Sequence, residues 1–152
     1  MNFLACDLGG TKVLLGIFER VINDVSPKLL FKKRYTSSDW DSFELILENF
    51  LKKECKNINH PSSACFAVAG PLSNNNAKIM NLSWNISGSK LKNKFKFQQC
   101  ELINDFAVQI YGIPFLKKIN IQLSRMDYNL KGLTMIYMPL LEPVLVWALR
   151  EV

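Results

Sequence analysis

Residues 7–12 read Asp7-Leu8-Gly9-Gly10-Thr11-Lys12 and lie between two short apolar runs. The runs, Phe3–Cys6 and Val13–Phe18, are bounded and contain β-branched and aromatic residues, which indicates strands rather than helices. We therefore expect a hairpin, with strands near residues 2–8 and 12–19 and a glycine turn at its tip.

The expected turn carries groups suited to binding a phosphate. Glycines have no Cβ, so the amide N–H groups of Gly9 and Gly10 could approach an anion closely. Thr11 adds a hydroxyl donor, and the carboxylate of Asp7 can hold a divalent cation through oxygen. The same residues also fit an ordinary hairpin in which Asp7 only caps the turn, and by themselves they leave both interpretations open.

A second polar pair, Asn104-Asp105, follows a short predicted strand over Glu101–Ile103. The apolar residues behind the pair fall on one side of a helix: Phe106, Ala107, Ile110 and Tyr111. Asp105 is thus expected at a strand-to-helix junction, where α/β proteins present polar groups to clefts. A helix N-terminus stabilises an ionised carboxylate, which could then accept a proton. The alternative for Asp105 is an ordinary helix N-cap.

The rest of this part of the chain predicts alternating strands and helices. A third strand is expected near residues 28–36, and a buried strand over Ala64–Ala69 that is ended by Gly70-Pro71. Between them Ser38 precedes a helix, with Asp41 in an imperfect capping box. One face of that helix is apolar and should lie on the sheet: Phe43, Ile46, Leu47, Phe50 and Leu51.

A turn and a further helix are expected before the polar pair. Asn74–Asn76 is typical of a turn, and Lys78–Leu82 of a short extended piece. Ser87 is expected to be the N-cap of a helix, with a hydrophobic staple between Ile86 and Leu91.

Four blocks together carry a resemblance to a known family: Asp7–Lys12, Cys65–Pro71, Met80–Trp84 and Leu102–Phe106, the last followed by Tyr111–Pro114. With these blocks in order, the chain from Met1 to about Leu116 resembles the bacterial glucokinases of the sugar-kinase/Hsp70/actin superfamily. Phe106, the Leu-Ser-Trp block and the lack of clustered cysteines favour this branch over relatives that mix kinases with transcriptional repressors. The resemblance implies an α/β fold, namely a ribonuclease H-like (actin-like ATPase) lobe with a mixed sheet and flanking helices.

The resemblance also implies an enzyme, an ATP-dependent hexose phosphotransferase that converts glucose to glucose 6-phosphate in the first step of glycolysis. Asp105 would be the general base, and Asn104 would hydrogen-bond the sugar. The segment that would bind ATP comprises Cys6, Asp7, Leu8, Gly9, Gly10 and Thr11. Asp7 would position Mg²⁺, directly or through water. The implied cofactors are ATP and Mg²⁺, and the implied partners are glucose and ATP.

Composition agrees with one reduced, cytoplasmic domain. The chain has 152 residues, of which 49% are apolar, enough for one core. Its four cysteines, at positions 6, 55, 65 and 100, are dispersed, and His60 is the only histidine, so we do not expect a zinc site. Met1–Phe3 leads straight into the first strand without a basic segment, so we expect no signal peptide.

The formal charge of +6 is concentrated in four alternating lysines, Lys90, Lys92, Lys94 and Lys96. On a helix, residues at this spacing spread around the axis, which favours a solvated basic surface over a nucleic-acid partner. Phe95 and Phe97 lie among the lysines and keep single-stranded nucleic acid as a minor alternative. Trp84 is expected to pack in the core rather than to stack on a sugar.

The end of the sequence departs from the family pattern. We divide the chain into a glucokinase lobe over residues 1–121 and an atypical apolar tail over residues 122–152. The tail includes Leu133–Leu149, which is interrupted by two prolines and a glutamate and falls below the ~20 residues that span a membrane. Codons for Pro143–Val152, shifted in frame, can encode Gly-Ala-Gly-Leu-Gly-Ile-Ala-Arg-Gly, close to a phosphate motif of the family's second lobe. We therefore hypothesise a frameshift origin for the tail.

Two interpretations of function follow. In the first, the protein is a glucokinase whose N-terminal lobe is present here. In the second, the chain is a truncated, non-catalytic remnant that at most binds nucleotide or sugar, because glucokinases need a second lobe to close the cleft. The sequence gives no indication of oligomeric state.

Overall fold

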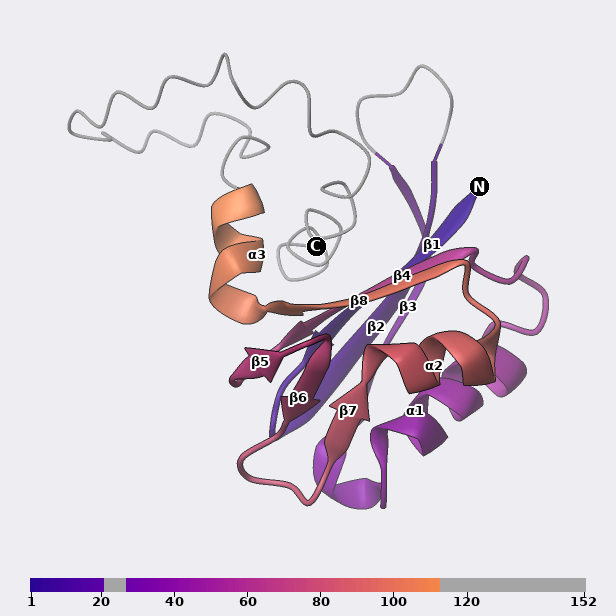
Figure 1. Cartoon of the computed structure of the whole chain (residues 1–152). Coiled ribbons are helices and arrows are strands. Elements are labelled where there is room, and N and C mark those ends of the chain that lie inside the picture. The colour runs from indigo at the N-terminus through magenta and orange to yellow at the C-terminus, as the bar shows by residue number, and fades with distance from the viewer. Residues whose placement is uncertain (21–26, 113–152) are drawn as a thin grey trace, which may run out of the picture.

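A computed structural model describes residues 1–20 and 27–112, with side chains described as far as residue 108. Five strands form the main sheet, in the order β3-β2-β1-β4-β8 (Figure 1). Their bounds are Asn2–Leu8 (β1), Lys12–Glu19 (β2), Lys28–Thr36 (β3), Ser63–Val68 (β4) and Gln99–Asn104 (β8). β2 runs antiparallel to β1 and β3, whereas β1, β4 and β8 are mutually parallel. The predicted tail, residues 122–152, lies outside the described residues.

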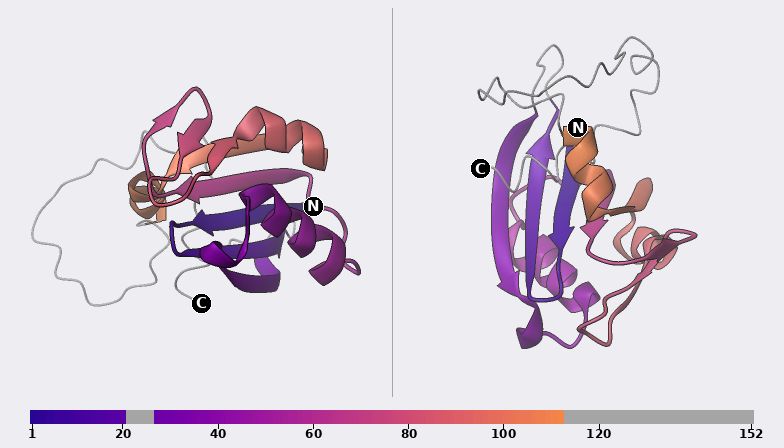
Figure 2. Two further views of the ribbon diagram at one scale, coloured as in Figure 1. Left: turned by 90° about the horizontal axis from the view of Figure 1, so that it is seen from below. Right: turned by 90° about the vertical axis from the view of Figure 1, so that its left-hand side faces the viewer.

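Helices cover both faces of this sheet (Figures 1 and 2). α1 (Phe43–Asn49) continues into a π-helical turn over Phe50–Glu54 and packs on the same face as α2 (Gly88–Phe95). α3 (Asp105–Gly112) packs on the other face, through Val108. The expected mixed sheet with flanking helices is confirmed.

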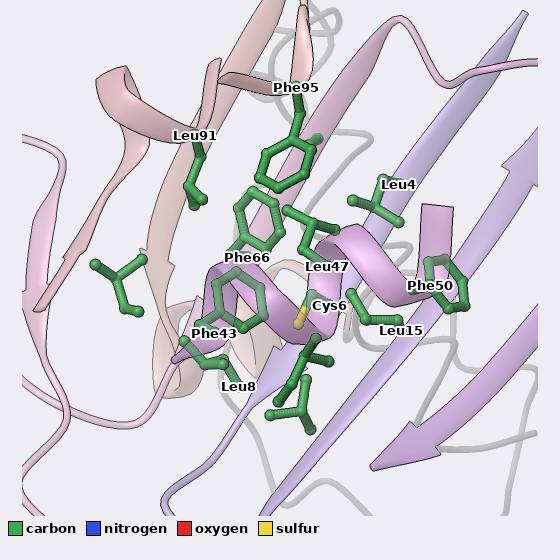
Figure 3. Close-up of a cluster of buried hydrophobic side chains, with 14 of the residues drawn as sticks. Leu4, Cys6, Leu8, Leu15, Phe43, Leu47, Phe50, Phe66, Leu91 and Phe95 are labelled. Atoms are coloured by element: carbon green, nitrogen blue, oxygen red, sulfur yellow. The ribbon is translucent and has the colours of Figure 1, made fainter. Parts of the chain in front are cut away.

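The larger core lies between the sheet and the helices α1 and α2 (Figure 3). Alternate residues of β1 point into it, because successive side chains of a strand face opposite sides of the sheet. The helix face predicted from periodicity supplies the other half, with Phe43, Ile46, Leu47 and Phe50 buried and Leu51 partly buried. The rings of Phe43 and Phe66 meet edge to face, 5.4 Å apart between centroids. Trp84 is 5% exposed and its indole N–H donates to the carbonyl of Asp41, so it is the packing residue that we expected.

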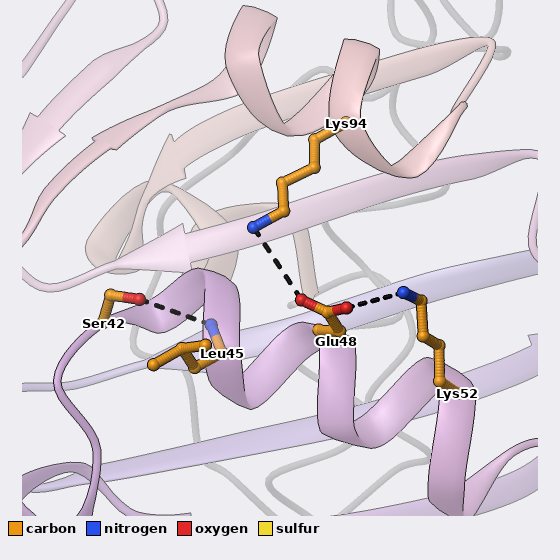
Figure 4. Close-up of polar contacts among 5 residues, drawn as sticks. All are labelled: Ser42, Leu45, Glu48, Lys52 and Lys94. Carbon is orange, nitrogen blue, oxygen red and sulfur yellow. Dashed lines mark hydrogen bonds and ion pairs between the residues drawn. The ribbon is translucent and has the colours of Figure 1, made fainter.

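The start of α1 differs from the prediction. Ser38 lies in a short 3-10 turn, Ser37–Asp39, where its hydroxyl bonds the carboxylate of Asp39, and the chain is extended again at Trp40. The N-cap is Ser42, whose hydroxyl accepts from the amide of Leu45 at 3.4 Å (Figure 4). A serine that caps a helix has an extended backbone. Ser38 and Ser42 are both serines, so residue type alone does not indicate which of them adopts that conformation.

Ion pairs tie α1 to α2. Glu48 bonds Lys52 one turn later at 2.6 Å and faces Lys94 of α2 at 4.0 Å (Figure 4). The hydrogen bond from Lys52 is the main cause that lowers the pKa of Glu48. All three side chains are exposed, so these contacts orient the helix surfaces and add little to stability.

A small second sheet lies beside the edge of the main one. It contains β5 (Leu72–Ser73), β6 (Asn76–Lys78) and β7 (Asn85–Ser87), all antiparallel. The turn expected at Asn74–Asn76 is present, with positive φ at Asn74 and Asn75. The prediction of an extended segment over residues 78–82 is wrong, because β6 ends at Lys78 and a turn follows. Strands of two or three residues are too short to show a period, which is why β5 and β7 were not predicted.

Asn75 fastens this small sheet to β8. Its side-chain amide donates to the carbonyl of Cys100 at 2.9 Å and accepts from the amide of Leu102 at 2.8 Å. Its own carbonyl accepts from the amide of Gly88, the first residue of α2. A Cβ at Gly88 would lie 2.3 Å from the side-chain nitrogen of Asn75, so only glycine fits there. Ser87 precedes α2 as expected, but its hydroxyl bonds Ser89 and caps no backbone amide.

We expect Gly88→Ala to lower the free energy of unfolding by about 1–3 kcal/mol, the usual cost of forcing an extra methyl into a packed site. The added Cβ would push Asn75 away from its partners on β8. Urea denaturation measures the loss. In an Asn75→Ala background the obstructing amide is gone and the same substitution should cost almost nothing, whereas equal costs in the two backgrounds would contradict the mechanism.

The apolar side of α3 that was noted in the sequence differs from the side that its described residues bury. Phe106 is 71% exposed, and the buried residue in the described part of α3 is Val108, which packs with Ala5, Cys65 and Ala67. The helix is apolar on more than one side, so its periodicity did not decide which side meets the sheet. The side chains of Ile110 and Tyr111 lie outside the described residues.

Candidate active site

The candidate site lies at the carboxyl edge of the three parallel strands. Leu8, Val68 and Asn104 are register partners in one row across β1, β4 and β8. The glycine turn leaves β1 at this edge, and Asp105 leaves β8 at the same edge (Figure 1). With strands about 4.8 Å apart, the two strand ends are separated by about 10 Å, with β4 between them. The structure therefore brings together the two regions that were singled out in the sequence.

The glycine turn is built from contacts with the protein itself. The amide of Gly9 donates to the carbonyl of Lys12 at 3.0 Å, and a Cβ on Gly9 would lie 3.1 Å from the same oxygen. A Cβ on Gly10 would lie 3.4 Å from the Cβ and side-chain nitrogen of Asn81. The approach at Gly9 is the tighter of the two, so a side chain there would require the carbonyl of Lys12 to shift by a few tenths of an ångström.

Gly9→Ala should cost about 1–3 kcal/mol of unfolding free energy, because the new methyl would press on a backbone carbonyl that the turn itself holds. Gly10→Ala is the matched control. Its methyl would meet an exposed asparagine at ordinary contact distance, and we expect a change within about 0.5 kcal/mol. Chemical denaturation of both variants checks the difference, and a larger loss for Gly10→Ala would contradict this account of the turn.

Only some residues of the segment predicted to bind ATP, residues 6–11, are accessible to solvent. The side chains of Cys6 and Leu8 are fully buried in the larger core, so only their backbone could meet a ligand. Burial, and then the neighbouring charge of Asp7, raise the pKa of the Cys6 thiol and keep it neutral. Asp7 alternates with these residues and so lies on the α3 face of the sheet, half-buried, while Thr11 is exposed.

Asn104 directly precedes α3 and caps its first turn. The side-chain oxygen of Asn104 accepts from the amide of Phe106 at 3.0 Å, and its NH₂ group donates to the carbonyl of Gly70 at 3.3 Å. Asp105 is the first residue of the helix, where one of its carboxylate oxygens also accepts from the amide of Phe106. Its side chain is half-exposed, so it is accessible at the carboxyl edge. The cap of α3 therefore does not depend on Asp105 alone, because Asn104 accepts from the same amide at the same distance.

Two residues near the turn were not identified as site residues from the sequence. Asn81 belongs to the quoted Met80–Trp84 block, but nothing in the sequence indicated that it lies against Gly10. Ser37 follows β3 and contacts the turn through two hydrogen bonds. Both contacts are long-range, and only the positions of the strands and of the β6–β7 connection reveal them.

The chemistry of the site fits Mg²⁺ better than a structural metal. In the parts of the chain that the structure describes, no three histidine, cysteine or acidic side chains come together to hold a metal. Mg²⁺ keeps most of its waters and is usually held by one or two carboxylates together with phosphate oxygens. Asp7, which lies next to the glycine turn, has a carboxylate of the kind that could serve in that mode of binding.

The basic segment around α2 offers no stacking platform. Phe95 and Phe97 are 7% and 4% exposed and belong to the core, so their faces are unavailable to bases. The ammonium of Lys94 lies over the ring of Phe95 and near Glu48. Within residues 1–20 and 27–112 there is also no helix of the length and apolarity needed to cross a membrane.

Solved structures share this fold. A glucokinase from an Antarctic psychrotroph aligns with a TM-score of 0.69 and 31% identity, over 77% of this chain and 36% of that one. A ROK family glucokinase from Streptomyces griseus, solved in complex with glucose and AMPPNP, aligns with a TM-score of 0.51 at 16% identity, over 74% of this chain and 36% of that one. The fold is thus the ribonuclease H-like, actin-like ATPase lobe that we expected, in the form found in sugar kinases.

Sequence comparison narrows this class to one family. The glucokinase family model matches residues 4–137. The glucokinase of Synechocystis sp. is 38% identical over 121 residues, which cover 74% of this chain and 34% of that protein. The chain belongs to the glucokinase family. It spans about a third of the length of the curated relatives it matches.

Proposed function

We propose that this chain is the N-terminal lobe of a cytoplasmic, glycolytic glucokinase, which transfers the terminal phosphoryl group of ATP to the 6-hydroxyl of glucose. The observation that carries the proposal is the shared carboxyl edge, where the glycine turn and Asp105 stand on either side of β4. Phosphoryl transfer depends mainly on alignment and on neutralising charge, which such an arrangement provides. The S. griseus enzyme, with the same fold, binds glucose and an ATP analogue.

The position of each site residue suggests its role in the proposed reaction. The exposed hydroxyl of Thr11 and the amides of the turn would bind phosphate, and Asp7 would hold Mg²⁺, which neutralises phosphate charge when bound. The carboxylate of Asp105 would take the proton of the sugar hydroxyl as its oxygen bonds to phosphorus and the bond to ADP breaks. Asn104 uses one amide hydrogen and one lone pair within the protein, which leaves one of each for the sugar.

A second candidate rests on the composition of residues 122–152, an apolar tail that is interrupted by two prolines and a glutamate. In it, residues 1–121 are a glucokinase lobe, residues 122–152 arose by a frameshift, and the chain binds nucleotide or sugar without turnover. The DNA sequence tests the frameshift directly. The alternative frame must encode the glycines of the second-lobe motif, and the hypothesis is rejected if it does not.

Two proteins assayed side by side test the proposals. The first is the chain itself, and the second is a hybrid in which residues 1–112 replace the matching segment of the Synechocystis glucokinase. Formation of glucose 6-phosphate from ATP is measured with a coupled dehydrogenase. We expect turnover by the hybrid and none by the chain alone.

The outcomes separate the candidates. Turnover by the chain alone would overturn the remnant interpretation. A hybrid that is folded but inactive, while the parent Synechocystis enzyme is active, would contradict the proposal that this lobe supports catalysis.

A further inference from the structure

Ser37 is one of two buried polar residues among those that the structure describes, and it contacts the glycine turn twice. Its hydroxyl donates to the carbonyl of Gly9 at 3.1 Å, and its backbone amide donates to the carbonyl of Thr11 at 2.9 Å. No part of Ser37 is exposed to solvent. A hydroxyl without access to water is stable only when it is hydrogen-bonded, so its position is fixed by its partner on the turn.

The sheet places Ser37 at this point. Lys12 and Thr36 are register partners in the antiparallel pair of β2 and β3, so the residue that follows β3, Ser37, lies opposite Thr11, the last residue of the turn. The chain then enters its 3-10 turn, where the carbonyl of Ser37 accepts from the amide of Trp40. Ser37 is thus held from both sides, by the ladder and by the short helix, and can act as a rigid support.

Three carbonyl oxygens at and beside this turn are engaged by hydrogen bonds within the protein. Those of Gly9 and Thr11 accept from Ser37, and that of Lys12 accepts from the amide of Gly9. Carbonyl oxygens carry partial negative charge and would repel a phosphate, whereas amide N–H groups attract one. With these three carbonyls held toward the protein, the amides of Gly10 and Thr11 are the groups of the turn that could meet an anion.

We propose that Ser37 is a positioning residue, which holds the Gly9–Thr11 turn in the orientation that presents its amides to a phosphate. The phosphate part of this inference rests on the proposed function. The positioning part does not, because it concerns the turn itself. In the enzyme, such a residue would lower the energetic cost of ordering the turn when nucleotide binds.

The test compares Ser37→Ala with Ser63→Ala in the whole chain. Ser63 is the other buried polar residue and begins β4 at the amino edge, away from the turn, so its loss is a matched control. NMR of the ¹⁵N-labelled chain gives order parameters for the turn and hydrogen-exchange protection of the Gly9 amide. For Ser37→Ala we expect the order parameters of Gly10 and Thr11 to fall from about 0.85 to below about 0.6. Protection at Gly9 should fall about five- to tenfold, the scale of one hydrogen bond.

A titration of the chain with magnesium tripolyphosphate, followed by NMR, tests phosphate binding at the turn. In the parent chain it should shift the Gly10 and Thr11 amide signals, and Ser37→Ala should raise the Kd about five- to tenfold while Ser63→Ala leaves it unchanged. Unchanged turn dynamics in Ser37→Ala, an equal effect of Ser63→Ala, or global unfolding of Ser37→Ala would each overturn the positioning role. A parent chain whose turn amides do not respond to tripolyphosphate, with the turn still loosened by Ser37→Ala, would instead contradict the proposed function.

Discussion

Asp105→Asn is expected to lower the turnover of the hybrid enzyme by about 10²–10⁴-fold, the range that a general base contributes. An amide has nearly the same shape as a carboxylate but does not accept a proton from the sugar hydroxyl. The helix cap should survive, because Asn104 also accepts a hydrogen bond from the amide of Phe106. The KM for glucose should therefore change much less than kcat. Initial rates in the coupled assay, over a range of glucose concentrations, measure both quantities.

Glu101→Gln is the matched control for this prediction. It also removes a carboxylate, but from an exposed position in β8 that is three residues before the last residue of the strand. Its kcat should stay within about twofold of the parent, since distant surface substitutions change energies by no more than about 0.5 kcal/mol. Comparable losses of kcat in the two variants, or full activity of Asp105→Asn, would contradict the assignment of Asp105 as the base.

Phe66→Ala is expected to destabilise the chain by about 3–5 kcal/mol, a large share of the roughly 5–15 kcal/mol that stabilises a typical domain. Phe66 is fully buried at the centre of β4, and its ring meets that of Phe43 edge to face. Truncation would remove this contact and leave a cavity between the sheet and α1 (Figure 3). Urea denaturation followed by circular dichroism measures the change.

Phe106→Ala provides the comparison, because it removes the same ring from a position that is 71% exposed. We expect a change within about 0.5 kcal/mol. If the two variants lost similar stability, the ring of Phe106 would have to pack in solution, and the described orientation of α3 would be wrong.

The main elements of the fold could be predicted because their patterns are long. The hairpin strands and the buried strand β4 are bounded apolar runs, and the apolar face of α1 recurs with the helical period. The strands β5 and β7 could not be recognised, because two or three residues show no period. The start of α1 depended on the backbone conformation at Ser38 and Ser42, and residue type does not distinguish two serines.

The site divides in the same way. Asp7, the glycines and Asp105 could be identified because a turn between strands and a strand-to-helix junction are local features of sequence. Ser37 and Asn81 could not, since their contacts with the turn depend on β3 and on the β6–β7 connection being brought to it. The cap of α3 could not be assigned from the sequence either. In the pair Asn104-Asp105 either residue can cap, and only the coordinates show that both accept from the same amide.

The attachment of Asn75 to β8 has a consequence for self-association. β8 is an outer strand, and outer strands offer free backbone groups on which another polypeptide can pair and extend the sheet. Through Cys100 and Leu102, Asn75 occupies two of those groups in the way that a neighbouring strand would. The opposite margin, β3, is rich in lysine and arginine, which repel a second copy of themselves. Among the described strands, one outer edge is thus partly covered by the side chain of Asn75 and the other carries like charges, and both features disfavour edge-to-edge pairing with a second copy.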